Sequence, residues 1–167
     1  MRCFIAAWPD EPTRLALSQV SEDLRKRVEH RRASRLEDLH LTLAFIGDLA
    51  TDVAFDLSDA IQKLRFRPFV WQPDTLGFFR DAGVVWLGTL GEPIKPLASL
   101  AERARALLER QGIGYDRRPL APHITLLRGV DSFVAEKVSP ISWHVESLAL
   151  YQSAPARSAS RYLRVAR

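Results

Sequence analysis

The chain has few of the residues and patterns that mark several common classes of protein. Its 167 residues contain one cysteine, Cys3, which excludes an internal disulfide framework and a metal site built from several thiolates. No apolar run approaches the roughly 20 residues of a membrane span, and the apolar stretch 3–8 is too short for the core of a signal peptide. We find no phosphate-binding glycine loop, no low-complexity tract and no long linker. These absences favour a protein of the reducing cytoplasm.

The composition is that of an ordinary globular protein with a mild basic excess. Hydrophobic residues make up 47% and charged residues 26% of the sequence, which is enough for a buried core in one domain or two small lobes. Lysine and arginine outnumber aspartate and glutamate by 24 to 20, a net charge of +4. This excess suits a phosphate-bearing partner, although many basic proteins bind no anion. We expect a monomer that does not associate with membranes.

Apolar spacing and turn residues divide the chain into strands and helices. The stretch 9–32 has the pattern of a helix, with Pro12 near its first turn, an apolar stripe and basic residues near its end. Thr51 is a suitable N-cap for a helix over 52–65, and Gly112 suits the end of a helix over 93–110. The predicted strands lie at 3–8, 39–47, 69–79, 84–90, 121–129, 143–153 and 161–167, and a polar loop, 154–160, separates the last two. This order predicts a mixed α+β fold with antiparallel pairing.

Two of these strands carry the same unusual pattern of polar residues. The segments "LHLTLAFIG" (39–47) and "APHITLLRG" (121–129) each place a histidine and a threonine two residues apart among leucines and isoleucine. Side chains alternate along a strand, so His40 and Thr42 share one face, as do His123 and Thr125. If the strands lie side by side or are related by a pseudo-twofold axis, the four polar side chains converge on one cleft.

Two imidazoles and two hydroxyls in one cleft fit attack on a phosphodiester. Imidazole titrates near neutrality, so one histidine can act as a neutral base while the other acts as a protonated acid. The threonine hydroxyls can donate hydrogen bonds to the non-bridging phosphate oxygens, and the scheme requires no metal.

The histidines of this sequence also have structural and metal-binding interpretations. A lone histidine in a strand is more often a hydrogen-bonded structural residue than a catalyst. A zinc site on His40 and His123 would lack a third ligand at a fixed spacing. His30, at a basic helix end, and His144, with no threonine two residues on, are interpreted as structural.

The residues around the two motifs resemble a known family. The segments "DLHLTLAFIGDL" (38–49) and "RPLAPHITLLR" (118–128) are similar to the paired HxT signatures of the two-histidine (2H) phosphoesterase superfamily. Within it they resemble the bacterial RNA 2′,3′-cyclic phosphodiesterases, long called 2′-5′ RNA ligases. The stretch "VVWLG" (84–88) and the C-terminal segment 148–167, similar to a closing Tyr…Ser…Tyr hairpin, extend the resemblance over nearly the whole chain.

The resemblance implies both a fold and a reaction. The expected fold is one bilobal α+β domain over residues 1–167, pseudo-twofold, with antiparallel sheets lining a central cleft and helices packed outside. The expected reaction is hydrolysis of an RNA 2′,3′-cyclic phosphate to a 2′-phosphomonoester without a cofactor or metal. By the family's roles His40 is the proton donor to the 3′ oxygen and His123 the acceptor that activates water, while Thr42 and Thr125 hold the phosphate.

The same resemblance suggests where a nucleoside could bind. Arg118 occupies the family's arginine position before the second motif, where it could stack on a base or pair with a phosphate; its alternative is a solvated loop charge. Phe4 is the candidate stacking ring, with a core position as its alternative. Phe45 falls on the Leu41 face by alternation and is assigned to the core. Leu120 stands where relatives often carry an aromatic residue, which weakens stacking from that loop.

The sequence leaves several functions open. A 2′-5′ ligase runs the same chemistry backwards, and a small cyclic nucleotide, such as an ADP-ribose-derived cyclic phosphate, is another candidate substrate. A non-catalytic module that binds RNA ends needs positive charge but not two titrating histidines. The basic cluster at 25–35 could guide RNA to the cleft or be a solvated helix face.

Overall fold

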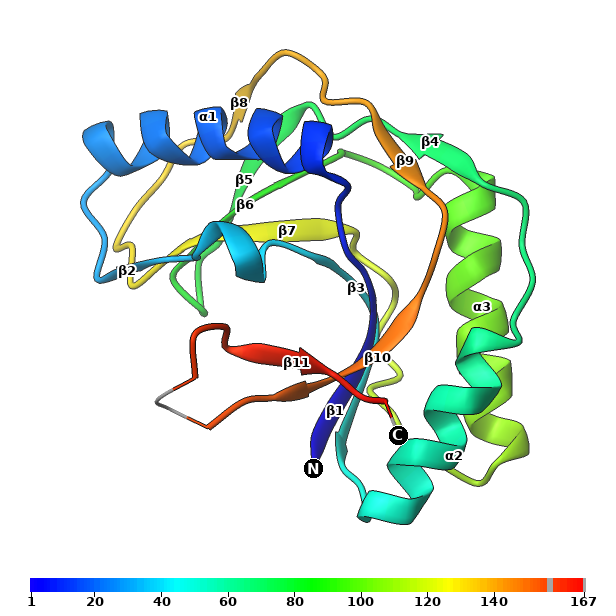
Figure 1. Cartoon of the computed structure of the whole chain (residues 1–167). Helices are drawn as coiled ribbons and strands as arrows, with labels where there is room; N and C mark the ends of the chain where they lie inside the picture. The colour runs from blue at the N-terminus through cyan, green and yellow to red at the C-terminus, as the bar shows by residue number, and fades with distance from the viewer. Residues whose placement is uncertain (156–157, 167) are drawn as a thin grey trace.

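The computed structural model describes residues 1–155 and 158–166. Two residues of the predicted loop 154–160 and the last residue of the predicted strand 161–167 lie outside this part of the chain. The described residues form the predicted α+β fold, with antiparallel sheets and helices packed against them (Figure 1). The helices are α1 (Glu11–Arg27), the short 3-10 helix η1 (Leu36–Asp38), α2 (Thr51–Gln62) and α3 (Lys95–Arg110).

The strands belong to two main sheets and one small one. The first sheet has the order β11-β10-β1-β3, from β11 (Tyr162–Arg164), β10 (Ala149–Ser153), β1 (Arg2–Ala7) and β3 (Leu41–Asp48). The second sheet has the order β2-β7-β6-β5-β8, from β2 (Arg32–Ala33), β7 (His123–Arg128), β6 (Val84–Gly88), β5 (Thr75–Phe79) and β8 (Glu136–Lys137). The small sheet pairs β4 (Phe69–Trp71) with β9 (Trp143–Val145). Each main sheet therefore contains one motif strand, β3 or β7, and these two strands approach each other where the sheets meet.

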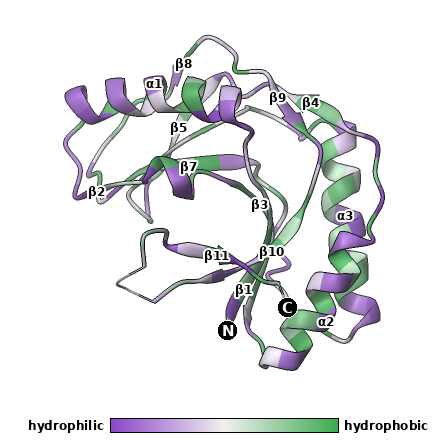
Figure 2. Cartoon of the chain, viewed as in Figure 1, coloured by the Kyte–Doolittle hydropathy of each residue, from purple (hydrophilic) through white to green (hydrophobic). Residues whose placement is uncertain are grey.

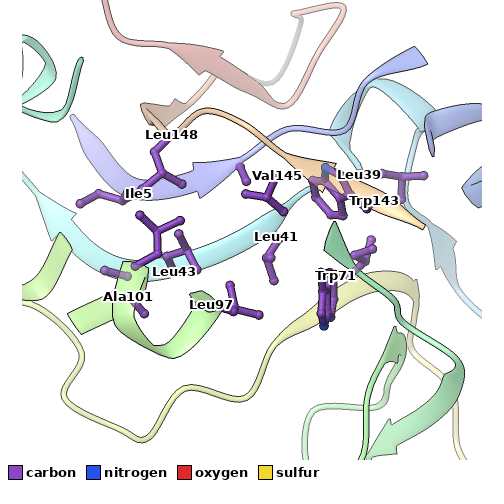
Figure 3. Close-up of a cluster of buried hydrophobic side chains, with 14 of the residues drawn as sticks. Ile5, Leu39, Leu41, Leu43, Trp71, Leu97, Ala101, Trp143, Val145 and Leu148 are labelled. Carbon is purple, nitrogen blue, oxygen red and sulfur yellow. The ribbon is translucent and has the colours of Figure 1, made fainter. Parts of the chain in front are cut away.

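The helices cover the sheets on the faces turned away from the motif side chains. Helix α3 packs against β3, and α2 packs against β10 and α3. Figure 3 shows Leu97 and Ala101 of α3 beside Leu41 and Leu43 of β3, which is the face opposite to Thr42. Figure 2 shows the corresponding hydrophobic stripes on α2 and α3, with hydrophilic residues on their outer surfaces.

Helix α1 lies on the other side of the molecule, across the second sheet (Figure 1). Its N-cap is Asp10, whose Oδ1 accepts a hydrogen bond from the backbone N–H of Thr13 at 2.9 Å. At its other end Arg27 pairs with Glu136 of β8 and so links the helix to the sheet. No helix in the described part of the chain is long and apolar enough to cross a membrane.

Several predicted boundaries are wrong. The N-cap of α2 is Ala50, and Thr51 is the first residue of the helix. The predicted strand 143–153 is two strands in different sheets, β9 and β10, and 69–79 likewise divides into β4 and β5. Periodicity cannot detect such a division, because consecutive strands that change sheets keep the same apolar composition.

Both motif strands contain a β-bulge at the same place. In β3 the pairing with β1 passes from Thr42 to Ala44, which leaves Leu43 as the extra residue. In β7 the pairing with β6 passes from Thr125 to Leu127, which leaves Leu126 as the extra residue. A bulge after the threonine reverses the alternation, so the residue five positions after each histidine returns to the histidine's face.

This reversal overturns the prediction that Phe45 belongs to the core. Leu43 and Ala44 are both buried, and the side chain of Phe45 is 51% exposed on the cleft side of β3. Its counterpart five residues after His123 is Arg128, which lines the same cleft. Strict alternation assigned Phe45 to the wrong face because the sequence does not mark the bulge.

Candidate active site

The structure brings the four predicted motif residues to one cleft. A cavity of about 610 Å³ is lined by His40 and Thr42 from the first sheet and by His123 and Thr125 from the second. His40 directly precedes β3 and His123 is the first residue of β7, so the two sheets present their motifs from opposite sides of the same space.

Each imidazole is held by a hydrogen bond to the backbone two residues earlier. His40 Nδ1 lies 2.6 Å from the carbonyl oxygen of Asp38, and His123 Nδ1 lies 2.7 Å from that of Ala121. A carbonyl only accepts, so both rings carry their proton on Nδ1 when neutral, and Nε2 is left to exchange a proton in the cleft. His30 makes the same local bond to Val28, so the cleft rather than the bond distinguishes the motif histidines.

More aromatic rings lie beside His40 than beside His123. The indole of Trp8 is stacked on the imidazole of His40 with centroids 4.7 Å apart and an interplanar angle of 9°. Phe4 and Tyr162 each lie 5.0 Å from the same ring, Tyr162 edge-on. A stacked indole favours a cation on the imidazole, since a positive charge is attracted to the face of an aromatic ring.

The ring of His123 has different neighbours. Phe79 meets it edge-on at 4.9 Å, and Trp86 lies 6.5 Å away. Trp86 can lie flat across the sheet because its partner on β5 is Gly77, where an added Cβ would come within 2.1 Å of the indole.

Burial lowers the pKa of both motif histidines. It lowers the pKa of His40 to about 4, because removal from water disfavours the charged imidazole. The bond to the Asp38 carbonyl and the charge of the Asp38 carboxylate raise this pKa, and the positive charges of His123 and Arg128 lower it further. Burial likewise lowers the pKa of His123, with Arg128 acting in the same direction.

Asp38 is a site residue that the sequence argument missed. Its side chain is 5% exposed, and its Oδ1 accepts hydrogen bonds from Ser160 Oγ at 2.7 Å and from the backbone N–H of Arg161 at 2.9 Å. Oδ2 is buried with no hydrogen-bond partner among the described residues. One residue therefore anchors the C-terminal hairpin through its side chain and orients His40 through its carbonyl. The sequence signal was a carboxylate two residues before the first motif histidine.

The candidate nucleoside-binding residues lie at the cleft, but they differ in exposure. Phe4 is 4% exposed and packs behind His40, against Tyr151 and Tyr162. Phe45, in contrast, is exposed and lines the cleft. Arg118 lines the cleft on an exposed loop, where its guanidinium pairs with the carboxylate of Asp116. The backbone N–H of Asp116 donates a hydrogen bond to the carbonyl oxygen of Phe45 at 2.8 Å.

The described residues contain no cluster of three or more histidine, cysteine, aspartate or glutamate side chains that could hold a metal ion. The polar side chains of the cleft are imidazoles, hydroxyls, guanidinium groups and the carboxylates of Asp38 and Asp116. Together they can exchange protons and bind an anion.

Comparisons with known proteins agree with this arrangement. A family model described as the 2′-5′ RNA ligase superfamily matches residues 11–156, which include both motif strands. The chain is 32% identical over 165 residues to the RNA 2′,3′-cyclic phosphodiesterase of Escherichia coli (strain K12), covering 91% of this chain and 93% of that one. A protein of the same name from Geobacillus stearothermophilus is 32% identical over 133 residues, which are 75% of this chain and 41% of that one. The crystal structure of E. coli LigT complexed with 3′-AMP superposes with a TM-score of 0.81 at 31% identity, covering 98% of this chain and 94% of the other.

Proposed function

The chain belongs to the 2′-5′ RNA ligase superfamily, and from this premise we propose that it hydrolyses RNA 2′,3′-cyclic phosphate ends to 2′-phosphomonoesters. The observation that carries the proposal is the convergence of two His-x-Thr strands, one from each main sheet, on a single cleft. The names of the E. coli and G. stearothermophilus relatives support the same reaction.

In the proposed reaction a water molecule attacks the phosphorus and the bond from phosphorus to the 3′ oxygen breaks. His123 Nε2 takes a proton from the attacking water, and His40 Nε2 gives a proton to the departing 3′ oxygen. The product is a 2′-phosphomonoester and a free 3′-hydroxyl, with both protons accounted for. Thr42 and Thr125 donate to the non-bridging oxygens, which gain negative charge in the transition state.

The assignment of His40 as the acid follows the roles that the family resemblance implies, since burial lowers the pKa of both histidines. The stacked indole of Trp8 and the nearby carboxylate of Asp38 both favour a positive charge on His40. Two groups thus oppose the effect of burial at His40, and no carboxylate does so at His123.

We further infer that the protein works as a monomeric, bilobal domain in the cytoplasm. A cleft completed within one chain and a buried, reduced Cys3 support this inference. Size-exclusion chromatography with light scattering would test it, and a stable dimer would contradict it.

The test of the function uses a short RNA that ends in a 2′,3′-cyclic phosphate, incubated with the protein in EDTA. Wild type should produce a 2′-phosphate, and His40→Ala and His123→Ala should each lower the rate by roughly 10²–10⁴, the usual contribution of general acid–base catalysis. His144→Ala is the matched control, because His144 is exposed on β9 outside the cleft. Tight binding without turnover by wild type would favour a module that binds RNA ends, and joining of a 5′-hydroxyl in preference to hydrolysis would favour a ligase.

A further inference from the structure

A second cavity opens beside the catalytic cleft and is lined by arginines. It has a volume of about 460 Å³ and lies between β2, β7 and the hairpin of β10 and β11. Arg32, Arg128 and Arg161 line both this cavity and the cleft, so the two spaces adjoin. We call these three residues with their cavity the arginine pocket.

The charges of the three guanidinium groups act on one another at Arg32. Burial and then the positive charges of Arg161 and Arg128 lower the pKa of Arg32. In the described part of the chain no ion pair or side-chain hydrogen bond engages these three groups, and no carboxylate lines their cavity. Like charges held close together destabilise a fold, and a bound anion relieves that cost.

The neighbouring Arg35 is used differently. Its guanidinium donates to the carbonyl oxygens of Ala159 at 2.5 Å and Ser158 at 3.5 Å, so it holds the hairpin in place. Asp38 holds the same hairpin through Ser160 and Arg161. The pocket wall is therefore fixed from both sides, and the side chains of Arg32, Arg128 and Arg161 remain for a ligand.

We propose that the arginine pocket binds a backbone phosphate of an RNA chain, on the 5′ side of the cyclic end. The inference rests on the proposed function and assigns its substrate class, which is an oligonucleotide in preference to a cyclic mononucleotide. Guanidinium groups bind phosphate through two parallel hydrogen bonds, and a chain whose end lies between the motif histidines must leave the cleft through an adjoining space. The arginine pocket is such a space, with the charge that a phosphodiester requires.

The experiment compares three substrates that share one base. They are uridine 2′,3′-cyclic phosphate, its 5′-phosphorylated form, and an oligouridylate with a 2′,3′-cyclic end. For wild type kcat/KM should be roughly ten- to a hundredfold higher for the oligouridylate than for the unphosphorylated mononucleotide, the usual effect of a hydrogen-bonded charged partner. A gain already seen with the 5′-phosphorylated form supports binding of the nearest phosphate, and a gain that needs the oligouridylate supports binding of one further along the chain.

Arginine variants test whether the preference for the oligouridylate arises in the arginine pocket. Arg32→Gln and Arg161→Gln should each reduce the ratio of kcat/KM for the oligouridylate to kcat/KM for the mononucleotide by about tenfold. The slope of the logarithm of this ratio against the logarithm of the salt concentration should become shallower by about 0.7. Arg110→Gln, on α3 outside both cavities, is the control and should keep the advantage. Arg128 is left unchanged because its charge also acts on both motif histidines.

The outcomes separate this inference from the proposed function. The proposal for the arginine pocket is overturned if wild type has equal kcat/KM for the mononucleotide and the oligouridylate. It is also overturned if the arginine variants lose kcat/KM equally on both substrates. Binding of an oligouridylate 2′-phosphate is measured in parallel, because it does not depend on turnover. Loss of its affinity in Arg32→Gln but not in Arg110→Gln supports the pocket even if wild type hydrolyses none of the three substrates, a result that would refute only the proposed function.

Discussion

A phosphate anion bound in the cleft should convert His40 from a neutral imidazole to one that is protonated in about half of the molecules near pH 7. In the free protein burial lowers the pKa of His40 to about 4. With a pKa about three units below the ambient pH, about one molecule in a thousand carries the proton. An acid catalyst of this kind depends on its substrate to acquire the proton that it later donates.

The size of the effect follows from the distance at which an imidazole contacts a phosphate. A unit negative charge about 4 Å from the ring, at an effective dielectric constant of about 20, stabilises the imidazolium by about 4 kcal/mol. That free energy corresponds to about three pKa units. The pKa of His40 should therefore rise from about 4 to about 7 on binding, which brings the acid into the physiological range.

The assay is an NMR titration of the histidine ring protons from acid to neutral pH, with and without a nucleoside 2′-monophosphate. His40→Ala assigns the resonance, and the resonances of His144, exposed on β9, should not move when the nucleotide is added. A His40 pKa near its ordinary value of 6.5 in the free protein would refute the argument from burial. A nucleotide that binds without raising the pKa would refute the argument from charge.

Three further predictions follow from the same contacts. Trp8→Leu removes the indole stacked on His40 and should move the alkaline limb of the kcat–pH profile about one unit lower, since a desolvated cation–π contact contributes about 1–2 kcal/mol; a shift to higher pH would mean that the indole acts only by excluding water. Phe45→Ala removes the exposed ring on β3 and should raise KM for nucleotide substrates by roughly tenfold, more than it lowers kcat, as expected for loss of base stacking; an unchanged KM would exclude stacking on this ring. Between pH 6.5 and about 4, His40 is protonated in the unfolded chain but neutral in the folded protein, because its pKa is lowered only on folding. The free energy of unfolding should therefore fall by about 3 kcal/mol as the pH is lowered through this window. Urea denaturation of wild type and His40→Ala measures this loss, and an equal pH dependence in both would contradict it.

The sequence by itself determined the class of fold, the family and the pairing of the two motifs. A polar pair two residues apart in an apolar strand indicates one face of a sheet, whatever the strand's neighbours are. Two such strands, each followed by leucine, were enough to predict that His40, Thr42, His123 and Thr125 share a cleft, and the structure places them around one cavity. Helices were predicted for the same reason, because the spacing of apolar residues is a local property.

Only the tertiary structure decided the surroundings of these four residues. The bulges at Leu43 and Leu126 turn Phe45 and Arg128 into the cleft, and they arise from pairing with β1 and β6, which the strand's own residues do not encode. The carboxylate of Asp38 meets a hairpin that lies more than 120 residues later in the chain.

The stacked indole of Trp8 and the arginine pocket likewise join segments that are distant in sequence. A side chain's identity and its place on a strand are local properties, and its partners and its distance from water are set by the packing of the whole chain. For this reason the motif histidines could be found from the sequence, whereas the neighbours that set their pKa values could not.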